Sequence, residues 1–186
     1  MNSVSVTGKK WILKEYNVQD VTNLKNNFFL EEITAKLIAI KKIKNEEVEN
    51  YLNPAIKNLL PNPENLKDMI KATDRAVQAI NQKEKIGIFG DYDVDGATST
   101  AILGNYFREL KQTFEIYIPD RKKEGYGPSI DGFKNLLNKK VKLIFTVDCG
   151  TLSFKPIEYL YKNNIDVLVL DHHQSEIKLP KAHSIV

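Results

Sequence analysis

Hydrophobic and polar residues follow two different rhythms along the chain, and the change falls near Lys85. Before this point apolar residues recur at spacings of three and four, which is typical of one face of a helix. In residues 31–43 these positions are Ile33, Leu37, Ile40 and Ile43. The pattern predicts a helical N-terminal segment over residues 1–84.

A second helix is predicted to begin at Asn62-Pro63, since Asn is a good N-cap and Pro fits the first helical position. Apolar residues then keep the helical period to about Gln82. Residues 54–63 are therefore expected to connect this helix to the one before it.

After Lys85, short apolar runs alternate with amphipathic segments. The runs predict strands at residues 86–89, 114–118, 141–147 and 167–170. The segments between them predict helices at residues 97–110, 129–140 (capped by Ser129) and 154–163. This order implies right-handed crossovers and a mainly parallel sheet with helices on both faces. The predicted fold class is α/β, with the sheet domain at residues 85–186.

Composition fits a globular protein, with 42% hydrophobic and 27% charged residues among 186. No apolar run approaches the roughly 18 residues that cross a bilayer, and Met1 to Lys10 lack the hydrophobic core of a signal peptide. We therefore expect a cytoplasmic protein without membrane contact.

The single cysteine, Cys149, cannot form an internal disulfide. We interpret it as a small buried residue. The net charge is +3, and the sequence has no long basic stripe. Charge alone therefore neither indicates nor excludes a nucleic-acid ligand, and the motifs must decide.

Reactive side chains follow three of the four predicted strands. The segments are Gly90 to Gly96 (GDYDVDG), Asp148 to Gly150 and Asp171 to His173. The carboxyl ends of parallel strands meet at one edge of the sheet, so these acids and imidazoles should converge there. Gathering these acids without a countercharge would cost free energy through repulsion and desolvation. The sequence therefore predicts bound cations at this edge. Oxygen and imidazole ligands without thiolates favour Mn²⁺ or Mg²⁺, and two ions would suit phosphoester hydrolysis.

Each motif also has a structural explanation. The spacing of Asp91, Asp93 and Asp95 matches the start of an EF-hand loop, but Ile102 stands where that loop needs a glutamate, so we exclude it. Asp93 and Asp95 can also be helix-cap and turn residues. Asp148, or either histidine alone, can be an ordinary strand-end residue. Three such motifs at equivalent strand ends favour a site.

The second predicted strand leads into a basic loop, Ile118 to Pro128, with three consecutive cations and a Gly-Tyr-Gly turn. Arg121 suits bidentate phosphate recognition, and Tyr126 can contact a base or sugar. Lys122 and Lys123 are equally well explained as a solvated surface.

In this order, the segments 91–96, 119–127, 148–150 and 171–173 resemble the first four motifs of the DHH phosphoesterase superfamily. The stretch DYDVDGATST and the segments YIPDR and EGYG resemble its branch of RecJ-type single-strand-specific exonucleases. The helical preamble with Trp11 is similar as well, so the resemblance covers nearly the whole chain.

The resemblance implies a nuclease that degrades single-stranded DNA from the 5′ end in repair and recombination, with Mn²⁺ or Mg²⁺ as two bound ions. The implied metal ligands are Asp93, Asp95, Asp148 and His172. The implied catalytic residues are His173, which acts on the scissile phosphate or leaving group, Asp91, and Asp171, which orients the histidine pair. The implied substrate contacts are Arg121, Tyr126 and Ser99. Implied partners are single-stranded DNA and candidate repair proteins such as a helicase or a single-strand-binding protein.

Two departures qualify the resemblance. Small-substrate relatives carry a metal-binding histidine where this chain has Phe89, which favours the RecJ-type branch. The chain also stops at Val186, before the fifth-motif aspartate and the DNA-gripping domains, so we expect an N-terminal fragment with weak or no activity alone. The alternatives are a DHH hydrolase of short oligonucleotides, cyclic dinucleotides or pyrophosphate, and a non-catalytic DHH scaffold.

Overall fold

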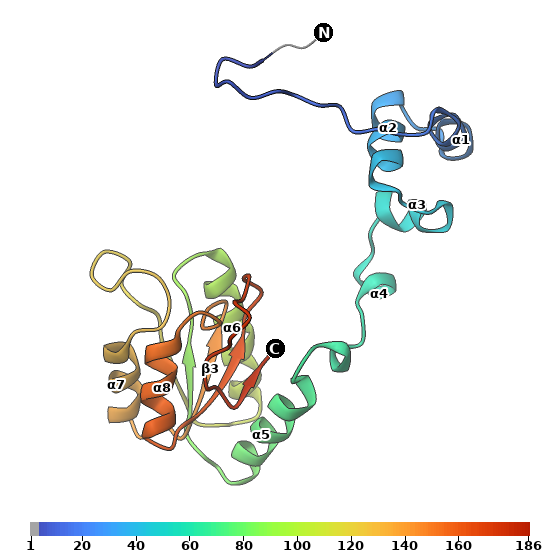
Figure 1. Cartoon of the computed structure of the whole chain (residues 1–186). Coiled ribbons are helices and arrows are strands. Elements are labelled where there is room, and N and C mark those ends of the chain that lie inside the picture. Colours follow the sequence, from blue (N-terminus) through green and yellow to red (C-terminus); the bar gives the residue numbers. More distant parts are fainter. Residues whose placement is uncertain (1–3) are drawn as a thin grey trace. The chain divides into compact units, whose positions relative to one another are not determined.

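The computed structural model describes residues 4–186, which form two compact units that divide after Pro61 (Figure 1). The division precedes the predicted boundary at residue 85, because the helix before the first strand packs with the sheet. No helix of residues 4–186 is long and apolar enough to cross a membrane.

The first unit is helical, as the spacing of its apolar residues predicts. Its helices are α1 (Val18–Phe28), α2 (Glu32–Lys41), α3 (Asn45–Leu52) and the single turn α4 (Ile56–Leu59). The turn α4 lies inside the segment predicted as a connector. A small core joins α1, α2 and α3 through Val21, Leu24, Ala35, Ile38 and Val48.

The apolar residues that predict helix α2 are not all buried. Ile33 and Leu37 are 66% and 53% exposed, whereas Ala35 and Ile38 are buried. Helix α2 has apolar residues on both sides, so periodicity alone cannot decide which side is covered. Ile43, which follows the helix, packs against the core of this unit.

The second unit begins with a correction to the predicted helix start. Asn62 does cap, accepting a hydrogen bond from the Glu64 amide, but only a 3₁₀ turn follows (η1, Pro63–Asn65). The helix itself, α5, runs from Met69 to Asn81. Asp68, immediately before it, adopts a left-handed conformation with φ of 55°, which turns the chain before α5 can begin.

All strand pairs of the sheet are parallel, which confirms the predicted fold class. The strands are β1 (Ile86–Phe89), β2 (Phe114–Tyr117), β3 (Leu143–Val147), β4 (Asp166–Leu170) and β5 (Ser184–Ile185). Their order is β2-β1-β3-β4-β5. The pattern analysis missed β5, because two residues are too few to show a period.

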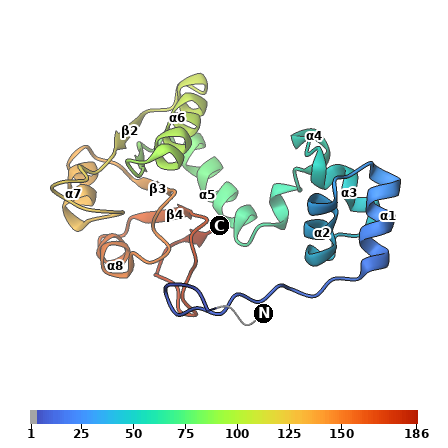
Figure 2. The same cartoon turned by 90° about the horizontal axis from the view of Figure 1, so that it is seen from above.

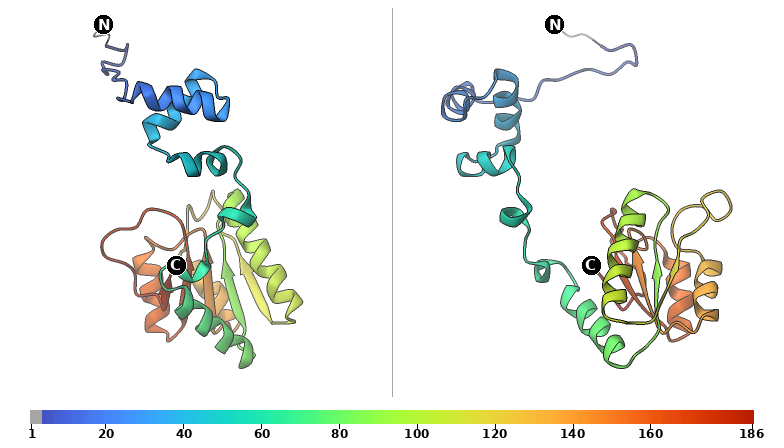
Figure 3. Two further views of the ribbon diagram at one scale, coloured as in Figure 1. Left: turned by 90° about the vertical axis from the view of Figure 1, so that its right-hand side faces the viewer. Right: turned by 180° about the vertical axis from the view of Figure 1, so that it is seen from behind.

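Helices cover both faces of the sheet (Figures 2 and 3). The remaining helices are α6 (Val94–Glu109), α7 (Ile130–Asn138) and α8 (Phe154–Lys162). Alternate residues of each strand point to opposite faces. On β1, Ile86 and Ile88 pack with α5 and α6, whereas Phe89 packs with α7 and α8. The two cores hold the sheet rigidly between helical layers.

The strand order places the candidate site. The chain leaves β1 toward β2 on one side, and later strands continue from β3 on the other side. Such a reversal opens a crevice at the carboxyl ends of the two central strands. The segments after β1, β3 and β4 therefore lie at one edge of the sheet. These are the three segments that carry the acids and histidines.

Candidate metal centre

The loop after β1 supplies two carboxylates in contrasting environments. Asp91 is fully buried; its Oδ1 accepts a 2.8 Å hydrogen bond from the Tyr92 amide, and its Oδ2 has no partner within residues 4–186. Burial raises the pKa of Asp91, and the neighbouring charge of Asp93 adds to the shift. Asp93 is exposed and accepts a 3.0 Å hydrogen bond from the Gly96 amide, which lowers the pKa of Asp93.

That hydrogen bond makes Asp93 the N-cap of α6. The helix therefore begins at Val94, three residues before the predicted start at Ala97. Gly96 permits the arrangement, because a Cβ at this position would lie 2.6 Å from the Asp91 carbonyl oxygen. The capping explanation of Asp93 is thus correct, and it does not compete with a role in the site.

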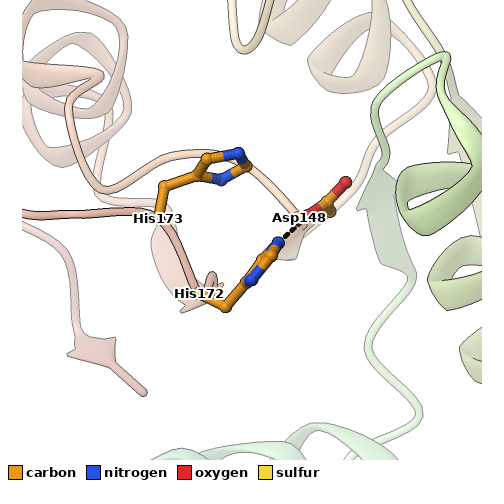
Figure 4. A group of neighbouring side chains, drawn as sticks. All are labelled: Asp148, His172 and His173. Carbon is orange, nitrogen blue, oxygen red and sulfur yellow. Dashed lines mark ion pairs between the residues drawn. The ribbon is translucent and has the colours of Figure 1, made fainter. Parts of the chain in front are cut away.

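Asp148 lies at the centre of the site. It follows β3 in a left-handed conformation with φ of 60° and is buried. His172 Nε2 lies 3.0 Å from Asp148 Oδ1 (Figure 4), yet neither carboxylate oxygen has a hydrogen-bond partner in the described part of the chain. Burial raises the pKa of Asp148, and the nearby Asp93 adds to this shift. A bound cation would relieve both effects.

Asp171, after β4, orients His173. Its Oδ1 lies 2.7 Å from His173 Nδ1, and its Oδ2 accepts a 2.9 Å hydrogen bond from the Thr151 amide. Although burial acts to raise the pKa of Asp171, the hydrogen bonds from Thr151 and His173 hold it below its ordinary value. The same contact raises the pKa of His173. This is the geometry of a carboxylate that fixes an imidazole ring.

Among residues 4–186, two groups of side chains offer ligand atoms within 4.8 Å of one another. One consists of Asp91, Asp93 and Asp148, and the other of Asp148, His172 and His173. Asp148 belongs to both, and carboxylate with imidazole is a suitable ligand set for Mn²⁺ or Mg²⁺. Asp91 Oδ2 and both oxygens of Asp148, which have no hydrogen-bond partner among residues 4–186, fit such an ion.

Asp95 lies outside both groups. It lines a cavity of about 600 Å³ together with Ser99, Asp148, His172 and the apolar residues Met69 and Leu170. Ser99 is thus near the cluster, on the first half of α6. The roles predicted for Asp95 as a ligand and for Ser99 as a substrate contact stay predictions.

The loop after β2 brings Tyr126 and Arg121 to the same edge. The Tyr126 hydroxyl lies 3.2 Å from His173 Nε2 and 3.3 Å from the Asp148 carbonyl oxygen. Its hydroxyl therefore faces the cluster, while 56% of the residue is exposed. The Arg121 guanidinium carbon lies 5.3 Å from the centre of the Tyr92 ring.

Sequence reasoning overlooked Tyr92, because a tyrosine between two acids looks like a spacer. No periodicity or spacing signals its contact with Arg121, which lies in a loop 29 positions later in the sequence.

Cys149 is buried, as predicted. Burial raises the pKa of its thiol, so the sulfur is protonated and unsuited to act as a nucleophile.

The all-parallel sheet thus brings acids and histidines together at the ends of β1, β3 and β4, which defines a site with ligand atoms suited to divalent metal ions. Residues 85–186 match the family described as DHH family, N-terminal domain. The chain therefore belongs to the DHH family, as its motifs indicate.

Similar curated proteins are named single-stranded-DNA-specific exonuclease RecJ. The one from Bacillus subtilis is 32% identical over 177 residues, covering 95% of this chain and 22% of the relative. The one from Haemophilus influenzae is 39% identical over 136 residues, covering 73% of this chain and 24% of the relative. The chain thus spans about a quarter or less of the length of these relatives.

Solved structures agree with the fold. An exonuclease RecJ bound to manganese is 34% identical, with a TM-score of 0.59 over 63% of this chain and 30% of the other. RecJ of Thermus thermophilus in complex with Mn²⁺ gives a TM-score of 0.68 over 91% of this chain and 23% of the other, at 24% identity. The second likeness concerns the fold alone.

Proposed function

We propose that this chain is the metal-binding part of an exonuclease that degrades single-stranded DNA from its 5′ end. Residues 85–186 would be the catalytic domain, and residues 1–84 would be the N-terminal segment before it. The observation that carries the proposal is Asp148, which belongs to two groups of ligand atoms and lies 3.0 Å from His172 Nε2. Its buried oxygens have no hydrogen-bond partner within residues 4–186. The similarity to proteins named as RecJ exonucleases supports the substrate.

Mn²⁺ or Mg²⁺ would be held by Asp93, Asp95, Asp148 and His172, with Asp148 shared between two ions. Asp91 and His173 offer further ligand atoms in the two groups. When bound, such ions supply positive charge for a phosphate and lower the pKa of water. Two cations would also balance the charge of Asp91 and Asp148, whose pKa values are raised by burial and by the nearby charge of Asp93.

The chain's own residues would bind and orient the substrate. Asp171 holds the His173 ring at Nδ1, and the Tyr126 hydroxyl lies 3.4 Å from Nδ1 and 3.2 Å from Nε2. His173 held in this way would act on the scissile phosphate or the leaving group. Arg121 would bind a backbone phosphate with its planar group of donors. Ser99 would contact the substrate from the wall of the cavity.

The test compares substrates in a version of the chain extended at its C-terminus as far as its relatives reach. With Mn²⁺, a single strand should be shortened from its 5′ end, and an intact duplex should resist. Arg121→Ala should slow degradation by roughly tenfold to a hundredfold through poorer phosphate positioning. Lys123→Ala is the matched control, because Lys123 lies in the same loop with an 82% exposed side chain.

Other substrates decide between this proposal and its alternatives. Faster hydrolysis of pyrophosphate, a cyclic dinucleotide or a short oligonucleotide would replace the proposed substrate. DNA binding without hydrolysis in the presence of any metal would indicate a non-catalytic scaffold.

We further propose that the protein acts in repair and recombination in the cytoplasm, with a helicase or a single-strand-binding protein as partner. Co-purification from cell extract with and without DNase treatment would test that partnership.

A further inference from the structure

The ring of Tyr92 connects two functional elements of the site. Its face lies against the guanidinium of Arg121, 5.3 Å from ring centre to Cζ. The rings of Tyr92 and Tyr126 meet nearly perpendicularly, at 88°, with their centres 6.4 Å apart. Tyr126 in turn contacts His173 through its hydroxyl group. Tyr92 thus touches the predicted phosphate-binding residue and the tyrosine that faces the cluster.

Tyr92 itself is fixed by its place in the chain. It stands between Asp91 and Asp93, and its amide donates the 2.8 Å hydrogen bond to Asp91 Oδ1. Asp93 caps α6 one residue later. The backbone on both sides of the ring is therefore held by the same acids that form the candidate metal centre.

Arg121, in contrast, has little else to hold its side chain. It is exposed, and among residues 4–186 it makes no ion pair, whereas its loop neighbour Lys123 lies 3.7 Å from Asp120. A free arginine side chain samples many rotamers, and ordering it on substrate binding would cost entropy. Stacking of the guanidinium on an aromatic face restricts the rotamers of the arginine side chain. It leaves the N–H donors at the edge of the guanidinium free for a phosphate.

We propose that Tyr92 is a positioning residue, which holds Arg121 ready for a nucleic-acid phosphate and supports Tyr126 beside His173. The inference rests on the proposed function, because the phosphate is that of the single strand. It assigns the tyrosine of the first motif a role in substrate binding, separate from the metal-binding role of the flanking acids.

The first measurement concerns the contact alone and needs neither substrate nor activity. In NMR spectra of the 186-residue chain, the ring current of Tyr92 should shift the side-chain protons of Arg121 upfield relative to those of Arg108. Tyr92→Leu should abolish the shift, and Tyr92→Phe should keep it. Ordinary shifts for Arg121 in the wild type would overturn the proposal.

The second measurement is a double-mutant cycle on DNA binding. Anisotropy of a labelled single-stranded oligonucleotide would be followed at low salt, with Ca²⁺ in place of Mn²⁺ to suppress turnover. Tyr92→Leu should weaken binding about fivefold, and Tyr92→Phe less than twofold. In an Arg121→Ala background, Tyr92→Leu should add almost nothing.

Tyr106→Leu serves as the matched control, since Tyr106 is a 54% exposed tyrosine on α6 and should not affect binding. Equal weakening by Tyr92→Leu with and without Arg121 would overturn the positioning role, as would a Phe variant as weak as the Leu variant. A C-terminally extended version that bound no single strand would instead overturn the proposed function, and the NMR shift would still report the contact. Should Tyr92→Leu fail to fold, Tyr92→Phe and the wild-type shift decide the question.

Discussion

The hydroxyl group of Tyr117 donates a 2.6 Å hydrogen bond to Glu124 Oε2. The other oxygen of Glu124 accepts a 2.9 Å hydrogen bond from the Asp120 amide. The carboxylate of Glu124 therefore joins the last residue of β2 to both ends of the turn that contains Arg121. This bonding fixes the backbone of the turn, while Tyr92 contacts the Arg121 side chain.

The first prediction is a loss of stability at high pH that depends on Tyr117. Burial, together with the carboxylate of Glu124, raises the pKa of Tyr117 from 10.0 to about 12. Between these values the unfolded chain has released the phenolic proton and the folded protein keeps it, so stability should fall as pH rises from about 10 to 12.

Urea denaturation at several pH values checks this expectation. Tyr117→Phe should show a smaller fall over the same range, because it has no proton to release at this position. Tyr161→Phe is a suitable control on α8, since Tyr161 is 59% exposed. An identical pH dependence in wild type and Tyr117→Phe would contradict the assignment of the raised pKa.

The second prediction concerns metal binding by Asp148. Asp148→Asn should weaken Mn²⁺ binding by more than about tenfold, because the substitution removes the charge of the shared carboxylate. Asparagine is preferred to alanine here, since it tolerates the left-handed backbone at this position. Calorimetric titration measures the affinity.

Asp131→Asn is the matched control for the loss of one carboxylate. Asp131 lies on α7, its side chain is 87% exposed, and it contacts Lys134. Its substitution should leave Mn²⁺ affinity unchanged. If the Asp148 and Asp131 variants bound Mn²⁺ equally well, the central role of Asp148 would have to be abandoned.

The third prediction concerns Arg75 of α5, which makes ion pairs with Asp166 on β4 and with Glu84 just before β1. Its Nε lies 2.7 Å from Asp166 Oδ2, and an Nη atom lies 2.8 Å from Glu84 Oε2, with only 10% of the arginine side chain exposed. Arg75→Ala should lower the free energy of unfolding by about 2 kcal/mol, less than for a fully buried pair because Asp166 is partly hydrated.

Urea denaturation gives this free energy directly. Lys71→Ala, at an exposed position of the same helix, should change it by no more than about 0.5 kcal/mol. Similar small changes in both variants would show that the two ion pairs add nothing to stability.

The fourth prediction is that this chain alone degrades single strands poorly. It spans only 22% and 24% of two curated relatives, and residues 86–186 carry equal numbers of basic and acidic residues, so few phosphate contacts are available. A C-terminally extended version should be faster per molecule in a side-by-side exonuclease assay with Mn²⁺ at matched salt. Comparable rates would mean that the motifs of this chain suffice.

The strands were predictable where local pattern and burial coincide. The run Ile86–Phe89 was predicted and found with the same bounds, because four apolar residues in a row suit a strand covered on both faces. Ser129 caps α7 as predicted, since the cap is a contact within one turn. In contrast, β5 depends on pairing with β4 and on Asp68, whose carboxylate accepts a hydrogen bond from the Ile185 amide 117 residues later.

By itself, the sequence determined which acids and histidines follow the strands, and so at which edge of the sheet they gather. Strand-end motifs must converge once strands are parallel, so Asp93, Asp148 and His172 could be placed together from alternation alone. Only the tertiary structure decided that Asp91 is buried, with one oxygen that has no hydrogen-bond partner in the described part of the chain. It also decided that Asp95 stands apart from both ligand groups and that Tyr92 contacts Arg121. The physical reason is that side-chain direction and burial depend on packing between segments remote in sequence, which no local period records.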